Sequence, residues 1–295
     1  MQSQPVVELR QGALRLEITP AVGGAISAFE WIGQGERRPI LRQCPTPLVK
    51  VLDAACFPLV PFVNRIRGGT FAFGGRQVRI APNMAGDPSP LHGQGWLNPW
   101  QVRNADSSRA LLGFDHQAGE WPWSYEARQE FSLDQGGLSI AMSCRNTSSE
   151  PMPCGLGQHP YFPCGSETRI DTRVEDVWTI DEHVLPVART PAQGRFDLND
   201  RLSCGQDLDH GFGGWSGKAR LGDPAWPYRV ELSSNDAHFF QLYSPASGGI
   251  FVAEPVTHAN AALNAPQSEW GELGLRVLEP GEEMAIAIRL DVLPI

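Results

Sequence analysis

The chain has 295 residues, of which 41% are hydrophobic and 19% charged, and its formal net charge is −9 at pH 7. This composition is typical of a folded globular protein, and its acidic balance argues against nucleic acid or an anionic membrane as a partner. No stretch approaches the ~18–20 consecutive apolar residues of a membrane-spanning helix.

Alternating apolar residues are the main structural signal along the chain, because a period of two is typical of β-strands with one buried face. The 31 glycines and 25 prolines are spread evenly, which predicts many short strands joined by turns. In chain order, the predicted buried faces carry Leu14, Leu16 and Ile18; Tyr125, Ala127, Gln129, Phe131 and Leu133; Leu138, Ile140, Met142 and Cys144; Tyr228, Val230 and Leu232; and Met284, Ile286, Ile288 and Leu290.

Glycine pairs predict the turns between some of these strands. Gly74-Gly75 predicts a hairpin over Phe71–Ile80, and Gly136-Gly137 separates two of the alternating segments. Gly33-Gln34-Gly35 opens no predicted helix, so we interpret it as a hairpin turn and not as a phosphate-binding loop. Residues 257–264 fit either one turn of helix or a loop.

The fold class follows from these patterns. No window of 12 or more residues shows a helical stripe, and no change in composition marks a domain boundary. We therefore predict an all-β protein, one domain over residues 1–295, built as a large antiparallel β-sandwich of two stacked sheets.

The six cysteines show neither a Cys-x-x-Cys pair nor the spacing of a zinc site. The N-terminal segment Met1–Pro5 lacks the basic region and apolar stretch of a secretory signal. We therefore predict a reduced, cytoplasmic protein with buried or incidental thiols and no metal.

Two histidines and a glutamate are the candidates for acid–base chemistry. His159 lies in Gln158-His159-Pro160-Tyr161-Phe162, where the proline favours an extended backbone and the two rings offer apolar walls. Glu254 ends the apolar run 250–253, so it is either paired with an arginine or kept for function. His92 precedes Gly93, which lets the backbone approach a ligand; otherwise His92 is a loop residue.

Other polar and aromatic residues are candidates for holding a ligand. Arg65, after Asn64, offers a fork of donors to hydroxyls, or forms a structural salt bridge. Asp209 either binds a polyol or caps a turn. Trp96 and Trp100 either stack on a sugar face or belong to the core. Taken singly, each is a weak signal.

Taken together, these segments resemble the aldose 1-epimerase (mutarotase) family of the galactose mutarotase-like superfamily. The resemblance runs from about residue 8 to the C-terminus, with the short motifs in family order. The matching segments are Asn64-Arg65-Ile66-Arg67, Leu91-His92-Gly93 with Trp96 and Trp100-Gln101-Val102, Gly155–Phe162, Asp209-His210-Gly211-Phe212, Phe239–Tyr243 and Ala253–Ala261.

The resemblance implies a single β-supersandwich domain, no cofactor, a small sugar as the partner, and interconversion of the α and β anomers of free aldoses. It implies Glu254 as the general base and His159 as the general acid, with His92 assisting. It also implies that Arg65 and Asp209, together with Asn64, Gln241 and Trp96, bind the sugar. In these roles we predict that Glu254 is ionised and that His159 is protonated for part of its cycle, each favouring the other's charge.

Two departures from the family pattern bear on the substrate. Gln158 precedes the acid histidine where Asn or an aromatic residue is common, and Val256-Thr257-His258 replaces the glutamine-containing run of the galactose-type enzymes. Both departures weaken galactose as the substrate, and leave mutarotation as the reaction.

Three other functions stay open. A hexose-6-phosphate epimerase of the same superfamily would need cations, which Arg65, Arg67, Arg76 or Arg79 could supply. A non-catalytic carbohydrate-binding or sensor protein would keep the cleft without turnover. A sugar-cleaving lyase would normally carry further domains. The oligomeric state is either monomer or homodimer.

Overall fold

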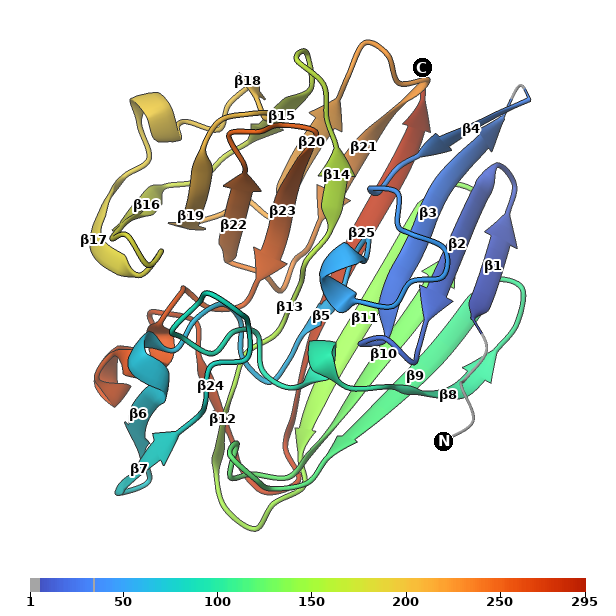
Figure 1. Cartoon of the computed structure of the whole chain (residues 1–295). Coiled ribbons are helices and arrows are strands. Elements are labelled where there is room, and N and C mark those ends of the chain that lie inside the picture. The colour runs from blue at the N-terminus through green and yellow to red at the C-terminus, as the bar shows by residue number, and fades with distance from the viewer. Residues whose placement is uncertain (1–5, 34) are drawn as a thin grey trace.

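The computed structural model describes residues 6–33 and 35–295. The expectations about Met1–Pro5 and about the turn at Gln34 therefore fall outside, or partly outside, the described residues. Two large antiparallel sheets dominate the molecule, and a smaller sheet near the N-terminus lies beside one of them (Figure 1). The predicted all-β sandwich is confirmed, and the helical segments of the described residues are short 3₁₀ turns.

The larger sheet has nine strands and provides most of the scaffold. Its central strands pair over long stretches, with Phe131 opposite Ile140 and Ile140 opposite Ile288. In spatial order the strands are β18 (Arg201–Leu202), β15 (Arg169–Thr172), β20 (Lys218–Gly222), β21 (Tyr228–Ser233), β25 (Glu283–Pro294), β11 (Gly137–Asn146), β10 (Tyr125–Leu133), β9 (Arg109–His116) and β8 (Gln101–Ala105).

The second large sheet has eight strands and carries most of the candidate functional residues. Seven strands follow in order, and β14 (Tyr161–Pro163) pairs with β23 off this path. In spatial order the seven are β17 (Pro186–Pro191), β16 (Asp176–Ile180), β19 (Leu208–Gly213), β22 (Phe239–Ser244), β23 (Ile250–Val256), β13 (Gly157–Gln158) and β5 (Pro58–Leu59).

Smaller elements complete the described chain. A four-stranded sheet contains β1 (Val7–Gln11), β2 (Leu14–Thr19), β3 (Ala25–Gly33) and β4 (Glu36–Pro39); the hairpin pairs β6 (Thr70–Phe73) with β7 (Arg76–Arg79), and β12 (Met152–Cys154) pairs with β24 (Arg276–Leu278). The 3₁₀ turns are η1 (Val51–Asp53), η2 (Arg67–Gly69), η3 (Gly95–Leu97), η4 (Gly194–Phe196), η5 (Ala262–Asn264) and η6 (Gln267–Glu269).

The alternating residues do form the core. Every residue predicted on a buried strand face is buried, and the main hydrophobic cluster includes side chains from Leu9 to Val292. Burial of this apolar surface is the dominant favourable term in folding. The predicted strand faces are therefore confirmed.

The turn predictions are confirmed where residues are described. Phe71 pairs with Val78 around the Gly74-Gly75 turn. At the other glycine pair, the Asp134 carboxylate accepts hydrogen bonds from the backbone N–H groups of Gly136 and Gly137. The ambiguous segment 257–264 is a loop that ends in the 3₁₀ turn η5.

The prediction of reduced cysteines is wrong for one pair. Cys164 and Cys204 form a disulfide across a sequence separation of 40 residues. Cys164 follows β14 and Cys204 precedes β19, and the sheet brings these two positions together around the intervening β22–β23 hairpin. Sequence spacing could not reveal this pairing, because the proximity is produced by the sheet topology. The other four cysteines are free.

No helix in the described part of the chain has the length and apolar character required to cross a membrane.

Candidate active site

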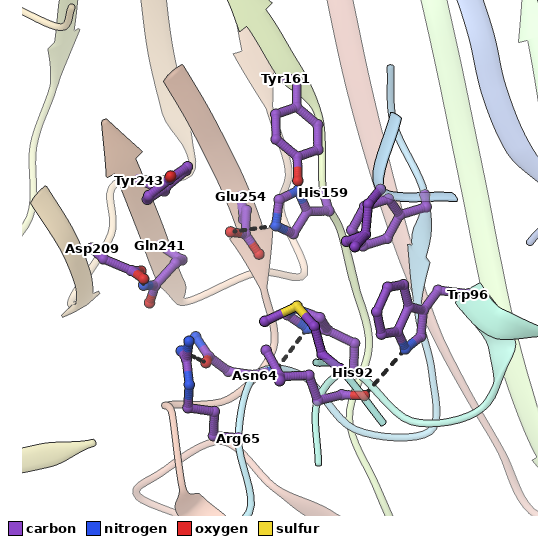
Figure 2. Close-up of a pocket in the computed structure, with 14 residues that line it drawn as sticks. Asn64, Arg65, His92, Trp96, His159, Tyr161, Asp209, Gln241, Tyr243 and Glu254 are labelled. Carbon is purple, nitrogen blue, oxygen red and sulfur yellow. Dashed lines mark hydrogen bonds and ion pairs between the residues drawn. The ribbon is translucent and has the colours of Figure 1, made fainter. Parts of the chain in front are cut away.

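A cavity of about 310 Å³ opens beside the eight-stranded sheet, and all eight residues predicted for the site line it. Figure 2 shows that their side chains converge from several segments that are far apart in the sequence. The lining residues are Leu52, Phe57, Asn64, Arg65, Met84, Leu91, His92, Trp96, His159, Tyr161, Asp209, Gln241, Tyr243 and Glu254.

Three neighbouring strands position the polar residues on one side of the cavity. In their register, Glu254 of β23 lies opposite Gln241 of β22, and Tyr243 of β22 lies opposite Asp209 of β19. Residues two apart on a strand share a face, so Gln241 and Tyr243 both point into the cavity. Gly211 faces Gln241 across the strands and leaves room for its side chain.

Two loops position Asn64 and His92 on the other side of the cavity. Both residues have left-handed backbone conformations, with φ of 58° and 59°. Such conformations are costly for residues other than glycine and concentrate at functional sites. The Asn64 backbone N–H donates to His92 Nδ1 at 3.0 Å. In neutral His92, Nε2 must therefore carry the proton, which makes this nitrogen the hydrogen-bond donor.

The closest acid–base pair in the cavity is His159 and Glu254. His159 Nε2 lies 3.4 Å from Glu254 Oε1, and both residues are buried (Figure 2). Burial in a medium that solvates charge poorly penalises the ionised form of each group. The pair lies where a proton donor and a proton acceptor could face the same bound molecule.

Burial shifts the two pKa values in opposite directions. It raises the pKa of Glu254 well above its usual range, and the nearby Asp209 carboxylate adds to this effect. Burial lowers the pKa of His159 to about 3, and the charge of Arg42 acts in the same direction. The expected pairing of a carboxylate with an imidazolium is therefore not the favoured state of the empty cavity. Removal from water outweighs the mutual attraction of the two groups.

Burial also lowers the pKa of His92 well below its usual range, and repulsion from His159 and Arg65 contributes. His92 is therefore neutral at physiological pH, with its tautomer fixed by the Asn64 backbone. A neutral imidazole of this kind can donate a hydrogen bond to a sugar oxygen without delivering a full proton.

A second polar cluster connects Arg65, Asp209 and Gln241 around the cavity. Gln241 Nε2 donates to Asp209 Oδ1 at 2.7 Å, and burial raises the pKa of Asp209 while the charge of Arg65 opposes that rise. Arg65 Nε bonds Asp87 Oδ2 at 2.8 Å, and its Nη1 donates to Asn64 Oδ1 at 3.1 Å. Arg65 thus forms a salt bridge and also lines the cavity.

The two tryptophans lie in different environments. Trp100 is fully buried in the core, where its indole N–H donates to the Gly95 carbonyl. Trp96 lines the cavity but is only 1% exposed, and its ring stacks on Phe57 with 5.3 Å between centroids. The suggested stacking of Trp96 on a sugar therefore stays a prediction.

Sequence reasoning missed several lining residues. Tyr243 follows Gln241 by two positions in the motif Phe239–Tyr243, which lies in strand β22, so the period of two could have identified it. Tyr161, which the sequence suggests as an apolar wall, does line the cavity. No sequence signal marks Leu52, Met84 or Phe57, since each reaches the cavity only through tertiary packing.

No three or more His, Cys, Asp or Glu side chains within residues 6–33 and 35–295 are placed to hold a metal ion.

The fold and the site define the class of protein. A family model described as aldose 1-epimerase matches residues 5–291. Among solved structures, an Escherichia coli K12 protein provisionally named an aldose 1-epimerase superposes with a TM-score of 0.88, at 30% identity and 99% coverage of both chains. A galactose mutarotase-like protein from Clostridium acetobutylicum has the same fold, with a TM-score of 0.84, 22% identity, and coverage of 98% of this chain and 95% of that one.

A curated relative extends the comparison at the level of sequence. The uncharacterized protein YphB of Escherichia coli K12 is 33% identical over 299 residues, covering 97% of this chain and 98% of YphB. The chain belongs to the aldose 1-epimerase family.

Proposed function

We propose that this protein is an aldose 1-epimerase that interconverts the α and β anomers of a free aldose. The observation that carries the proposal is the buried pair in the cavity, with His159 Nε2 3.4 Å from Glu254 Oε1. Hydroxyl-binding groups surround this pair, as a small polyol ligand requires. Family membership supports an isomerase of this kind.

In the proposed reaction, the pair shares one mobile proton. Glu254, as the general base, takes the proton of the anomeric hydroxyl, and His159, as the general acid, supplies a proton to the ring oxygen. The C1–O5 bond breaks and a carbonyl forms at C1. Rotation about C1–C2 presents the other carbonyl face, and the reverse proton transfers close the ring. Each form of proton assistance is worth roughly 10²–10⁴ in rate.

The opposed pKa shifts suit this proton sharing. The form with the proton on Glu254 and a neutral His159 has the same total charge as the form with a carboxylate and an imidazolium. Binding a sugar against both groups replaces lost hydration with hydroxyl hydrogen bonds, so that the reactive form becomes accessible. The pair titrates as a unit, and activity requires its singly protonated state.

The surrounding residues then have assignable roles in binding. Asp209 and Gln241 would accept from and donate to hydroxyls on one side of the ring. Arg65 and the Nε2–H of His92 would donate on the other side, with Asn64 holding both in place. The reaction requires neither a metal nor a covalent intermediate.

The charges at the cavity favour an uncharged sugar over a sugar phosphate. Arg65 is the one arginine or lysine among the lining residues, and it is already paired with Asp87. Arg67 pairs with Asp181, and Arg76 pairs with Glu150. The carboxyl groups of Asp209 and Glu254 also line the cavity, and neither can offer a positive charge to a phosphate in any protonation state.

Polarimetry on freshly dissolved α-D-glucose and α-D-galactose is the direct test. We expect the purified protein to accelerate the change in optical rotation, and both His159→Ala and Glu254→Gln to abolish the acceleration. A panel of further free and phosphorylated aldoses, followed by exchange of their anomeric NMR signals, would identify the sugar. Binding without exchange for every sugar would instead indicate a carbohydrate sensor.

A further inference from the structure

The imidazole of His159 is held by ring stacking and not by a second hydrogen bond. Its ring lies 4.4 Å from that of Phe57, stacked at 21°, and 4.7 Å from that of Tyr161. Its Nδ1 is buried, and no group in the described chain hydrogen-bonds it. Histidines that transfer protons are commonly oriented by a partner at the other ring nitrogen. In this protein the rings of Phe57 and Tyr161 contact the imidazole of His159 and restrict its orientation instead.

Arg42 lies over the ring of Tyr161 and is not itself among the residues that line the cavity. Its guanidinium carbon lies 3.4 Å from the centroid of the Tyr161 ring, an arrangement in which a cation is attracted to the face of an aromatic ring. Arg42 therefore contacts Tyr161, and the Tyr161 ring in turn lies beside both the His159 imidazole and, at 6.2 Å between centroids, the Phe57 ring. Arg42 is half-buried, and within the described residues it has no carboxylate partner.

The side chain of Arg42 is fixed by two backbone carbonyl groups. Its Nε donates to the carbonyl of Ala54 at 2.7 Å, and its Nη2 donates to the carbonyl of Leu52, a residue that lines the cavity. The backbone N–H of Arg42 also donates to the Tyr161 carbonyl at 2.8 Å. A single residue thus ties the Leu52–Ala54 turn to the strand that carries Tyr161.

We propose that Arg42 is a positioning residue that acts on His159 through the ring of Tyr161. It holds the Tyr161 ring against the imidazole, so that Nε2 stays directed at Glu254 and the cavity. Its positive charge also disfavours an imidazolium and makes a protonated His159 a stronger acid toward the sugar ring oxygen. The catalytic part of this inference rests on the proposed function, whereas the effect on the His159 ring does not.

Other ionisable groups near His159 can also influence its pKa, in addition to the charge of Arg42. They are Glu254 on β23, His92 in the loop before η3, Tyr161 on β14, and Cys56, whose thiol contacts the His159 backbone. Burial raises the pKa values of Tyr161 and Cys56, so both stay neutral near pH 7. Glu254 is then the group of this set whose ionised form favours a proton on His159. Arg42 is the permanent cation in this set, because a guanidinium does not deprotonate in proteins.

The test uses Arg42→Met, which removes the charge while keeping an apolar stem over Tyr161. Polarimetry would give kcat and KM, and NMR of histidine labelled in the imidazole ring would follow the His159 ring directly. We expect kcat to fall between about tenfold and a hundredfold with little change in KM, as for a small misplacement of a catalytic group. We also expect the His159 titration midpoint to rise by about half a unit to one unit.

The direction of the pH effect separates positioning from simple structural support. Without the cation, His159 holds a proton more tightly, so both limbs of the kcat profile move to higher pH. Arg42→Lys keeps the charge but not the forked contacts with two carbonyls. We expect it to keep the pH limbs of the native protein and to show an intermediate kcat.

Arg76→Met is the matched control. Arg76 lies over the Trp123 ring, at 4.9 Å from its centroid, and is paired with Glu150 away from the cavity. Tyr161→Leu should lower kcat as Arg42→Met does, whereas Tyr161→Phe, which keeps the ring, should leave the His159 titration close to native.

The inference is overturned if Arg42→Met and Arg76→Met give the same His159 midpoint. It is also overturned if kcat falls in Arg42→Met with no movement of either pH limb, since that would show support without electrostatic action. Should no aldose be turned over, the NMR titration still decides the role of Arg42, and the failure then belongs to the proposed function alone.

Discussion

The two large sheets differ in how their strands are buried, and the difference separates scaffold from site. In the nine-stranded sheet, β25 alternates buried and exposed residues over nearly its whole length, from Met284 to Val292. In the eight-stranded sheet, β23 is buried from Phe251 to Val256 on both faces. A strand with one solvent-exposed face requires apolar residues only on its buried face. A strand buried on both faces can hold a carboxylate such as Glu254 only within a polar cluster.

We therefore expect that the stability and the activity of this protein can be changed independently, by substitutions in different sheets. Substitutions in the nine-stranded sheet should act on the free energy of unfolding. Substitutions at the cavity edge of the eight-stranded sheet should act on turnover. The buried polar groups there are unfavourable for stability, so replacing them need not destabilise the fold.

The largest expected effect is the loss of turnover in Glu254→Gln. The amide keeps the shape of the side chain but cannot accept the anomeric proton, so kcat should fall by roughly 10²–10⁴. The Tm should stay equal to or above that of the native protein, because a carboxyl group whose pKa is raised by burial has been replaced. Polarimetry and thermal unfolding measure the two effects.

The matched control for that substitution is Glu283→Gln at the exposed start of β25, which should change neither kcat nor Tm. Retained turnover in Glu254→Gln would move the general base to another residue, with Asp209 the first to examine.

A core substitution in the nine-stranded sheet should give the opposite result. Ile288 is buried and lies opposite Ile140, so Ile288→Ala should lower the free energy of unfolding by about 2–5 kcal/mol. The kcat of the folded fraction should not change. Denaturant unfolding and polarimetry below the transition test this. Ala287→Ser on the exposed face is the control, and a parallel loss of kcat in Ile288→Ala would show that the two sheets are not independent.

The pH dependence of stability should carry a contribution from His258, next to the eight-stranded sheet. The Val63 backbone N–H donates to its Nε2, its Nδ1 bonds the Ala259 carbonyl, and burial lowers its pKa to about 4. Between the unfolded pKa of about 6.5 and the folded value, the unfolded state binds more protons. The contribution is therefore complete above pH 6.5 and is lost as the pH falls toward 4.

At pH 5 the loss should amount to about 2 kcal/mol relative to pH 7.5. His258→Gln should remove this part of the pH dependence, whatever its effect on absolute stability. Denaturant unfolding at the two pH values measures it, and the exposed His183→Gln provides the comparison. An unchanged pH dependence in His258→Gln would show that the folded protein tolerates a charged His258.

The smallest expected effects come from two tyrosine hydroxyl groups, one in each sheet. Tyr243→Phe removes a hydroxyl from the cavity, and we expect KM to rise a few-fold with kcat unchanged, as for an interaction made equally with substrate and transition state. Tyr228→Phe removes a hydrogen bond of 2.8 Å to the Pro39 carbonyl. It should cost about 1 kcal/mol of stability and leave KM unchanged. An effect of Tyr228→Phe on KM would contradict the separation of the sheets.

Much of the scaffold could be predicted from the sequence, because its signal is local. The period of two in segments such as Tyr125–Leu133 and Met284–Leu290 identifies strands and their buried faces without knowledge of any partner. The hairpin at Gly74-Gly75 is local for the same reason. All of these predictions are confirmed.

The candidate site residues were named from short motifs, and the structure brings all eight to one cavity. The charge states within that cavity could not be predicted in the same way. Removal from water opposes the ionised forms of Glu254 and His159, and this depends on every group packed around them. The Cys164–Cys204 disulfide could not be predicted for a related reason. The order of the strands in the sheet brings the two cysteines together, and their spacing in the sequence does not reveal this.

The all-β class, the buried strand faces and the candidate residues for acid–base chemistry could all be inferred from the sequence. Each of these inferences depends only on a short local pattern of residues. Three relations arise only in the folded chain: Glu254 lies 3.4 Å from His159, the Asn64 backbone fixes the tautomer of His92, and Arg42 lies over the Tyr161 ring beside His159. Those relations depend on packing between segments far apart in the chain, and burial at the same place sets the protonation states of Glu254 and His159.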